Sequence, residues 1–146
     1  MKNIKKLNKV IKLDLALIPM ALLSIITGFL LHAASHGNSH ALWEFWAVVH
    51  ILCSIAFMVM IGIHIKHHKA WFVSFIKNMR IKTSKGRMNL LLLLFFIVTI
   101  STGLILLFIW DDHSKLGLWH YKIGILFAVL SIAHIIRRHA VLHKII

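Results

Sequence analysis

The chain has 146 residues, of which 60% are hydrophobic, and it carries a formal net charge of +13. Soluble domains are only about half apolar, so this composition excludes an ordinary soluble globule. The one cysteine, Cys53, excludes an intramolecular disulfide, a Cys-rich metal site, an iron–sulfur cluster and covalent c-type haem attachment. The twelve histidines are the unusual feature that needs an explanation.

Four apolar stretches are each long enough to cross a bilayer, which takes about 20 residues. They run over residues 13–31, 42–65, 88–110 and 116–136. We therefore predict an all-α polytopic membrane protein, in which four transmembrane helices form an up-and-down bundle. We expect the first stretch to be retained as a span, because it is long for a signal peptide and lacks a typical cleavage site.

Basic residues fall almost entirely on one side of the predicted spans. Fifteen of the seventeen Lys and Arg residues precede the first span, lie between the second and third, or follow the fourth. The positive-inside rule makes this side cytoplasmic. We predict a multi-pass protein of a bacterial cytoplasmic (inner) membrane with both termini in the cytoplasm. Contact with membrane lipid accounts for the charge, so we expect no nucleic acid partner.

The cytoplasmic loop between the second and third spans, about residues 66–87, has its own pattern. Residues 70–76 read Ala-Trp-Phe-Val-Ser-Phe-Ile and are flanked by lysines. This predicts a short amphipathic helix in the lipid headgroups. We interpret it as a membrane anchor, with a docking surface for a cytoplasmic partner as the alternative.

The chain resembles one helical hairpin written twice, about 12–65 and about 88–138, within a single membrane domain of residues 1–146. A shift of 75 residues aligns the first span with the third, and a shift of 70 aligns the second with the fourth. The longer outer loop of the first hairpin absorbs the difference at small cost. The aligned pairs are Asp14 with Asn89, Ser24 with Thr99, Thr27 with Thr102, Gly28 with Gly103, His50 with His120, and His64 with His134.

The four aligned histidines are the strongest functional signal. His50 and His64 are 14 residues apart, as are His120 and His134, so the two of each span project from nearly one helix face, about 21 Å apart. Histidine at membrane depth is costly and usually functional. One haem between His50 and His120 and a second between His64 and His134 would explain all four, since iron takes an imidazole on each face of the ring. Zinc or copper suits the pattern less well, because two ligands per level leave the ion undercoordinated.

Small residues lie at the depth of the outer histidine pair. Gly28 and Gly103 lack a side chain, which would let the edge of a macrocycle approach the helix. Close helix packing through small residues is the alternative. We favour the haem interpretation because the two glycines match the histidines in depth.

Charged residues near the predicted membrane surfaces complete the candidate site. Lys122 is expected to reach outward to a propionate of the outer haem. Arg137 and Arg138 are expected to meet water, lipid phosphate or propionates of the inner haem. Asp14 is interpreted as a helix-start residue favoured by the helix dipole, with a proton carrier near a quinone as the alternative.

Three further histidines, His32, His36 and His40, are spaced by four near the first outer loop. They would share a helix face if the helix continued. Gly37-Asn38-Ser39 predicts instead that the helix stops. We therefore expect an exposed loop, with a metal or quinone-headgroup site as the alternative.

Two helices that each carry His-x13-His, with glycines on their partner helices, resemble the transmembrane di-haem core of bc-complex cytochrome b. The small size, the hairpin repeat and the two Thr-Gly pairs are more similar to the short DUF4405 family, the flavinylation-associated cytochromes. The resemblance covers roughly residues 12–140. It implies that His50, His64, His120 and His134 are axial ligands of haem iron and that the chain carries electrons across the membrane.

The expected function is therefore that of a di-haem b-type cytochrome with two non-covalent, bis-histidine haems. It would act as an electron-transfer subunit of a larger oxidoreductase system, such as a respiratory chain, with catalysis in its partners. Quinol or a cytoplasmic donor would act at one face, and an extracytoplasmic flavoprotein, cytochrome or reductase at the other, with the direction of electron flow left open. A metal or small-solute transporter with a histidine-lined path is the alternative.

Overall fold

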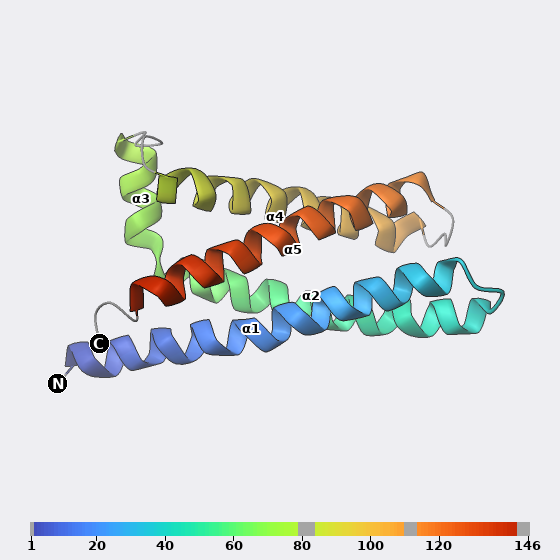
Figure 1. Cartoon of the computed structure of the whole chain (residues 1–146), viewed down its shortest axis with the longest axis horizontal. Coiled ribbons are helices and arrows are strands. Elements are labelled where there is room, and N and C mark those ends of the chain that lie inside the picture. The colour runs from blue at the N-terminus through green and yellow to red at the C-terminus, as the bar shows by residue number, and fades with distance from the viewer. Residues whose placement is uncertain (1, 79–83, 110–113, 143–146) are drawn as a thin grey trace. The chain divides into compact units, whose positions relative to one another are not determined.

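The computed structural model describes residues 2–78, 84–109 and 114–142, with the side chains of 11–70, 72–74, 86–109 and 114–137. Within these residues the chain is helical, without a strand, which confirms the all-α class (Figure 1). The helices are α1 (Lys2–Ser35), α2 (His40–His67), α3 (Lys69–Asn78), α4 (Ser84–Ile109) and α5 (Lys115–Leu142).

Four of these helices are long and apolar enough to cross a membrane. The candidate spans are Ile11–Ser35, His40–His67, Gly86–Ile109 and Lys115–Arg137. They contain the four predicted spans, except that the predicted end of the third, residue 110, lies outside the described residues. Large apolar side chains on these helices are exposed, including Phe108 at 90% and Leu52 at 63%. Contact with water would cost about 25 cal/mol for each Å² of such surface, and lipid removes that cost. The chain is a multi-pass membrane protein.

The helices form two compact units, each of which contains a pair of packed helices. The first unit, Met1–Asn78, packs α1 against α2. The second, Met79–Ile146, packs α4 against α5. In each pair the chain runs along one helix and returns along the other (Figure 1). The two predicted hairpins are therefore present, and their packing into one four-helix bundle stays a prediction.

Both hairpins restart their second helix with a serine. Ser39 has an extended backbone, and its hydroxyl accepts a hydrogen bond from the Leu42 amide at 3.3 Å. Ser114 accepts from the Gly117 amide at 3.0 Å in the same way. Serine satisfies amide groups at a helix start that have no partner within the helix. These caps set where α2 and α5 begin.

The outer loop of the first hairpin ends α1 as the Gly37-Asn38-Ser39 pattern predicts. Residues 36–39 are exposed and lie outside any helix. His36 Nδ1 bonds to the carbonyl of His32 at 2.9 Å, and the His40 ring makes an edge-to-face contact with Trp43 at the start of α2. The expected exposed loop is confirmed for residues 36–39, whereas His32 is half-buried within α1 and His40 is the first residue of α2.

The helix predicted in the cytoplasmic loop is α3. It begins at Lys69, directly after the end of α2, and covers the predicted residues 70–76. The expectation of a short helix there is confirmed. Its location in lipid headgroups stays a prediction.

Candidate functional site

His50 is held in the first hairpin by a threonine on the facing helix. Thr27 on α1 is buried, at 5% exposure, and its hydroxyl donates to the carbonyl of Leu23, one turn earlier, at 2.8 Å. The same oxygen lies 3.1 Å from Nδ1 of His50 on α2. Since the hydroxyl hydrogen is already engaged, Nδ1 carries the proton and donates it to Thr27. Nε2 of His50 then keeps its lone pair.

The second hairpin repeats this arrangement. Thr102 on α4 donates its hydroxyl to the carbonyl of Val98 at 2.9 Å. Its oxygen lies 2.9 Å from Nδ1 of His120 on α5. The same reasoning places the proton of His120 on Nδ1 and the lone pair on Nε2. Two segments 70 to 75 residues apart in sequence thus build the same polar unit.

The glycines that follow these threonines make room for the histidine rings. A Cβ added at Gly28 would lie 3.1 Å from Cε1 of His50, and one added at Gly103 would lie 3.1 Å from Cε1 of His120. Each glycine therefore allows an imidazole edge to approach the helix backbone within its own hairpin. From the sequence we expected these glycines to make room for the edge of a macrocycle. The additional approach of a macrocycle stays a prediction.

Serines distinguish the first hairpin from the second at this depth. The hydroxyls of Ser24 on α1 and Ser54 on α2 are 3.0 Å apart, and Ser54 lies 3.5 Å from Nε2 of His50. The aligned positions of the second hairpin are Thr99, which bonds to its own helix at Phe95, and Gly124, which has open space around it. Nε2 of His50 therefore has a hydroxyl nearby, whereas Gly124, at the position aligned with Ser54, has no side chain that could supply one.

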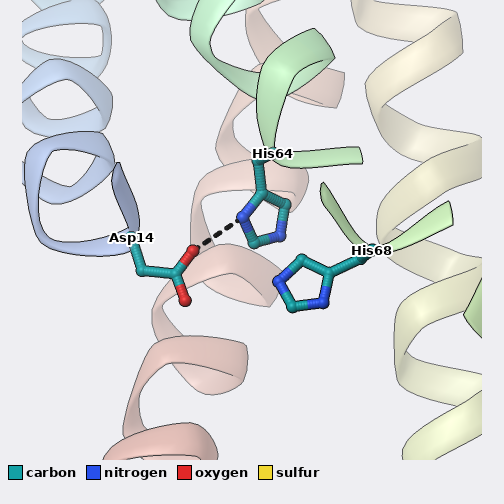
Figure 2. A group of neighbouring side chains, drawn as sticks. All are labelled: Asp14, His64 and His68. Atoms are coloured by element: carbon teal, nitrogen blue, oxygen red, sulfur yellow. Dashed lines mark hydrogen bonds and ion pairs between the residues drawn. The ribbon is translucent and has the colours of Figure 1, made fainter. Parts of the chain in front are cut away.

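The inner histidine of the first hairpin is bound by a carboxylate. Nδ1 of His64 on α2 lies 2.8 Å from Oδ1 of Asp14 on α1, as Figure 2 shows. A carboxylate only accepts, so Nδ1 of His64 carries the proton that is shared with Asp14. The side chains of His64 and Asp14 are 27% and 20% exposed, respectively, so water is partly excluded from the pair.

The interpretation of Asp14 as a helix-start residue is wrong. Helix α1 begins at Lys2, twelve residues earlier, because the lysine-rich segment before the span is helical too. Asp14 therefore lies well inside the helix, beyond the first turn over which the dipole acts. Its carboxylate instead contacts His64 across the hairpin.

His68 adds a third ligand-type side chain to this end of the hairpin. It caps the end of α2, where its amide donates to the carbonyls of His64 and Ile65. Its ring centre is 4.6 Å from that of His64. Within the described part of the chain, ligand atoms of Asp14, His64 and His68 all lie within 4.8 Å of one another (Figure 2).

The remaining candidate residues lie on α5. His134 is half-buried, and Arg137 is exposed near the end of the candidate span. The side chain of Arg138 lies outside the described residues. Lys122 is exposed, with its ammonium group 5.4 Å from the centre of the Trp119 ring. This is a cation–π contact, and the expected propionate contacts of Lys122, Arg137 and Arg138 stay predictions.

The partners of His50, His120 and His64 were not predicted from the sequence. Thr27, Thr102 and Asp14 were noted only as aligned positions or as a helix start. The usable signal was that each Thr-Gly pair lies at the depth of a histidine, where a buried imidazole needs an acceptor for its N–H group. A single acid on the predicted cytoplasmic side was a similar signal for His64.

The donor set suits a ring-bound iron. A histidine that ligates a metal through one nitrogen commonly donates its other N–H group to a carboxylate or another acceptor, which fixes the tautomer. His50, His64 and His120 each have this arrangement, with Nδ1 bonded across a hairpin.

Comparisons with known protein families, with characterised proteins and with solved structures found no match to this chain.

Proposed function

We propose that the chain is a di-haem b-type cytochrome that carries electrons across the bacterial cytoplasmic membrane. His50 and His120 would hold the outer haem, and His64 and His134 the inner haem, each through Nε2. The observation that carries the proposal is the Thr-Gly/His unit, which is built in both hairpins with the same contacts. Packing alone does not require two histidines to be oriented in the same way.

The side chains of the chain would bind and orient each haem, which would supply one-electron chemistry at its iron. Thr27 and Thr102 fix the ring orientation and the proton of the outer ligands. Asp14 does the same for His64. With histidine on both faces of the iron, oxygen has no open coordination position, so the arrangement supports electron transfer.

The proposed circuit has a donor at the cytoplasmic face and an acceptor outside. The donor would be quinol or another reduced carrier, and the acceptor a flavoprotein, cytochrome or reductase. The chain would then be a subunit or module, and catalysis would reside in its partners. Lys122, Arg137 and Arg138 would contact propionates near the two membrane surfaces.

Absorption spectroscopy tests this proposal directly. We expect the full chain, purified in detergent, to show reduced b-type bands and two haems per chain. His50→Ala or His120→Ala should lose one haem, and His64→Ala or His134→Ala should lose the other. His67→Ala is the matched control, because His67 is exposed beside the inner ligand and should keep both haems. A colourless protein would exclude a cytochrome.

The cluster of Asp14, His64 and His68 favours a second candidate, a histidine-lined transporter of divalent metal ions. One carboxylate and two imidazoles form a common donor set for zinc. Titration calorimetry with Zn²⁺ separates the two functions. Binding to the colourless protein that is lost in both Asp14→Asn and His68→Ala would favour transport. A haem-loaded protein that binds no Zn²⁺ would favour the cytochrome.

A further inference from the structure

The two levels of histidines differ in the charge of the group that accepts the Nδ1–H. At the outer level this group is a threonine hydroxyl, which is neutral. At the inner level, His64 donates instead to the carboxylate of Asp14. On the basis of the proposed function, we infer that Asp14 is a positioning residue that lowers the reduction potential of the inner haem below that of the outer haem. Electrons then pass outward, from the inner to the outer level.

The direction of the effect follows from the hydrogen bond. A carboxylate that accepts the N–H group of a ligating histidine makes the imidazole more basic. A more electron-rich ligand stabilises Fe(III) over Fe(II), which lowers the reduction potential. The Nδ1–Oδ1 distance of 2.8 Å is that of a charge-assisted bond. Partial burial of both side chains reduces screening by water and salt.

A single negative charge acts at the inner level. The chain has four acidic residues, and Asp14 alone falls on the predicted cytoplasmic side. The second hairpin has Asn89, a neutral amide, at the position aligned with Asp14. At the proposed inner haem, the ligand His64 is therefore bonded to a carboxylate, and the aligned position of the second hairpin carries no charge.

Basic residues at the same end oppose this effect. Lys12, Lys66 and Lys69 are exposed, and their positive charges favour Fe(II). Water and salt screen exposed charges over about 8 Å at physiological ionic strength. The carboxylate acts through a direct bond to the ligand ring, so its contribution dominates.

The inference gives the chain a place in a reaction sequence. One electron leaves Fe(II) at the inner level, which becomes Fe(III), and reduces Fe(III) at the outer level to Fe(II). A quinol or reduced flavin is oxidised at the cytoplasmic face, where its protons are released. An oxidised carrier outside is reduced. A membrane potential that is negative inside favours the same direction.

A redox titration of the full haem-loaded chain, followed by its absorption bands, tests the inference. We expect two one-electron components, of which the lower is missing in His64→Ala. In Asp14→Asn the midpoint potential of the lower component should rise by at least about 59 mV. At a fixed potential this makes the Fe(II)/Fe(III) ratio of a one-electron couple at least tenfold larger. Asp14→Glu should restore the lower value. Asn89→Asp adds a second carboxylate and should lower it further.

Glu44→Gln is the matched control, because Glu44 is an exposed acid on α2 outside this contact. We expect it to leave both components unchanged. The inference is overturned if the wild-type components coincide, if Asp14→Asn shifts only the higher one, or if Glu44→Gln has the same effect. Should Asp14→Asn lose the inner haem, an unchanged potential in Asn89→Asp overturns the inference. A wild-type chain without haem overturns the proposed function itself, which the spectrum shows before any titration.

Discussion

The hydroxyl of Thr27 bonds both within its own helix and across the hairpin, and the two directions have different roles. It donates to the carbonyl of Leu23 in its own helix and accepts from Nδ1 of His50 across the hairpin. The first bond fixes the direction of the second, since a hydroxyl has one hydrogen to give. A buried imidazole thereby obtains a defined tautomer from a neutral residue.

Replacing Thr27 with valine should therefore weaken the outer site without changing its volume. Thr27→Val removes this acceptor of the Nδ1–H of His50, and the loss of one hydrogen bond costs about 0.5–1.5 kcal/mol. We expect a lower thermal midpoint and faster loss of the outer haem, with Thr27→Ser close to wild type. Thr99→Val is the control, because Thr99 bonds only to its own helix at Phe95 in the contacts described here. Equal effects of the two valine substitutions would contradict the assigned role.

The glycine beside each threonine gives a second prediction at this scale. A methyl group at Gly28 or Gly103 would lie 3.1 Å from a histidine carbon, so Gly28→Ala or Gly103→Ala should push the ring away by a few tenths of an ångström. We expect reduced occupancy of the outer haem and an unchanged inner haem, measured by haem content per chain. Gly62→Ala meets open space and should have no such effect. A full outer haem in Gly28→Ala would show that the ring tolerates the displacement.

At the scale of the helices, a polar contact links α1 to α2 in the first hairpin. Ser24 and Ser54 share a hydrogen bond of 3.0 Å between surfaces that are otherwise mainly apolar. Lipid is as apolar as these side chains, so burial drives helix association weakly in a membrane and polar contacts and close packing contribute more. The second hairpin has no equivalent pair at Thr99 and Gly124.

A double-mutant cycle on Ser24→Ala and Ser54→Ala should measure this contact. Interhelical hydrogen bonds in membranes contribute about 0.6 kcal/mol on average, so we expect a coupling of that size in the free energy of unfolding. The measurement is unfolding of the full chain in mixed detergent micelles. Additive effects of the two substitutions would mean that the bond contributes nothing to hairpin stability.

The helices themselves were largely predictable from the sequence. Apolar length gave four spans, and Gly37-Asn38-Ser39 gave the end of α1. The start of α1 was not predicted, because the lysine-rich pattern before the first span does not show whether those residues are helical. The partners of His50 and His64 were not predicted either, because spacing along one helix does not tell which residue of the neighbouring helix faces it. Alignment by depth makes Thr27 a candidate partner of His50 and Asp14 a candidate partner of His64, but it does not establish either contact.

At the scale of the whole molecule, charge distribution predicts the topology. Residues 2–12, 66–87 and 137–144 carry fifteen of the seventeen Lys and Arg residues. The outer loops carry few. The positive-inside rule then places α3 on the cytoplasmic side and residues 36–39 outside.

Single-cysteine labelling checks this orientation. In a Cys53→Ala background, Asn38→Cys should react in intact cells with a maleimide that does not cross membranes. Ser74→Cys on α3 should react only in inverted membrane vesicles. Both positions are exposed, so neither depends on unfolding. The opposite labelling pattern would reverse the proposed path of electrons.

The intrahelical bond of each threonine also has a consequence for maturation of the protein. If the proposed function holds, the lone pair on Nε2 of His50 and of His120 is available before haem binds, because Thr27 and Thr102 make their bonds within their own hairpins. Maturation would then proceed in two stages. Each newly inserted hairpin first forms its own Thr-Gly/His unit, and haem binds afterwards. Loading at the outer level should release no proton, since the accepting nitrogen has none to lose.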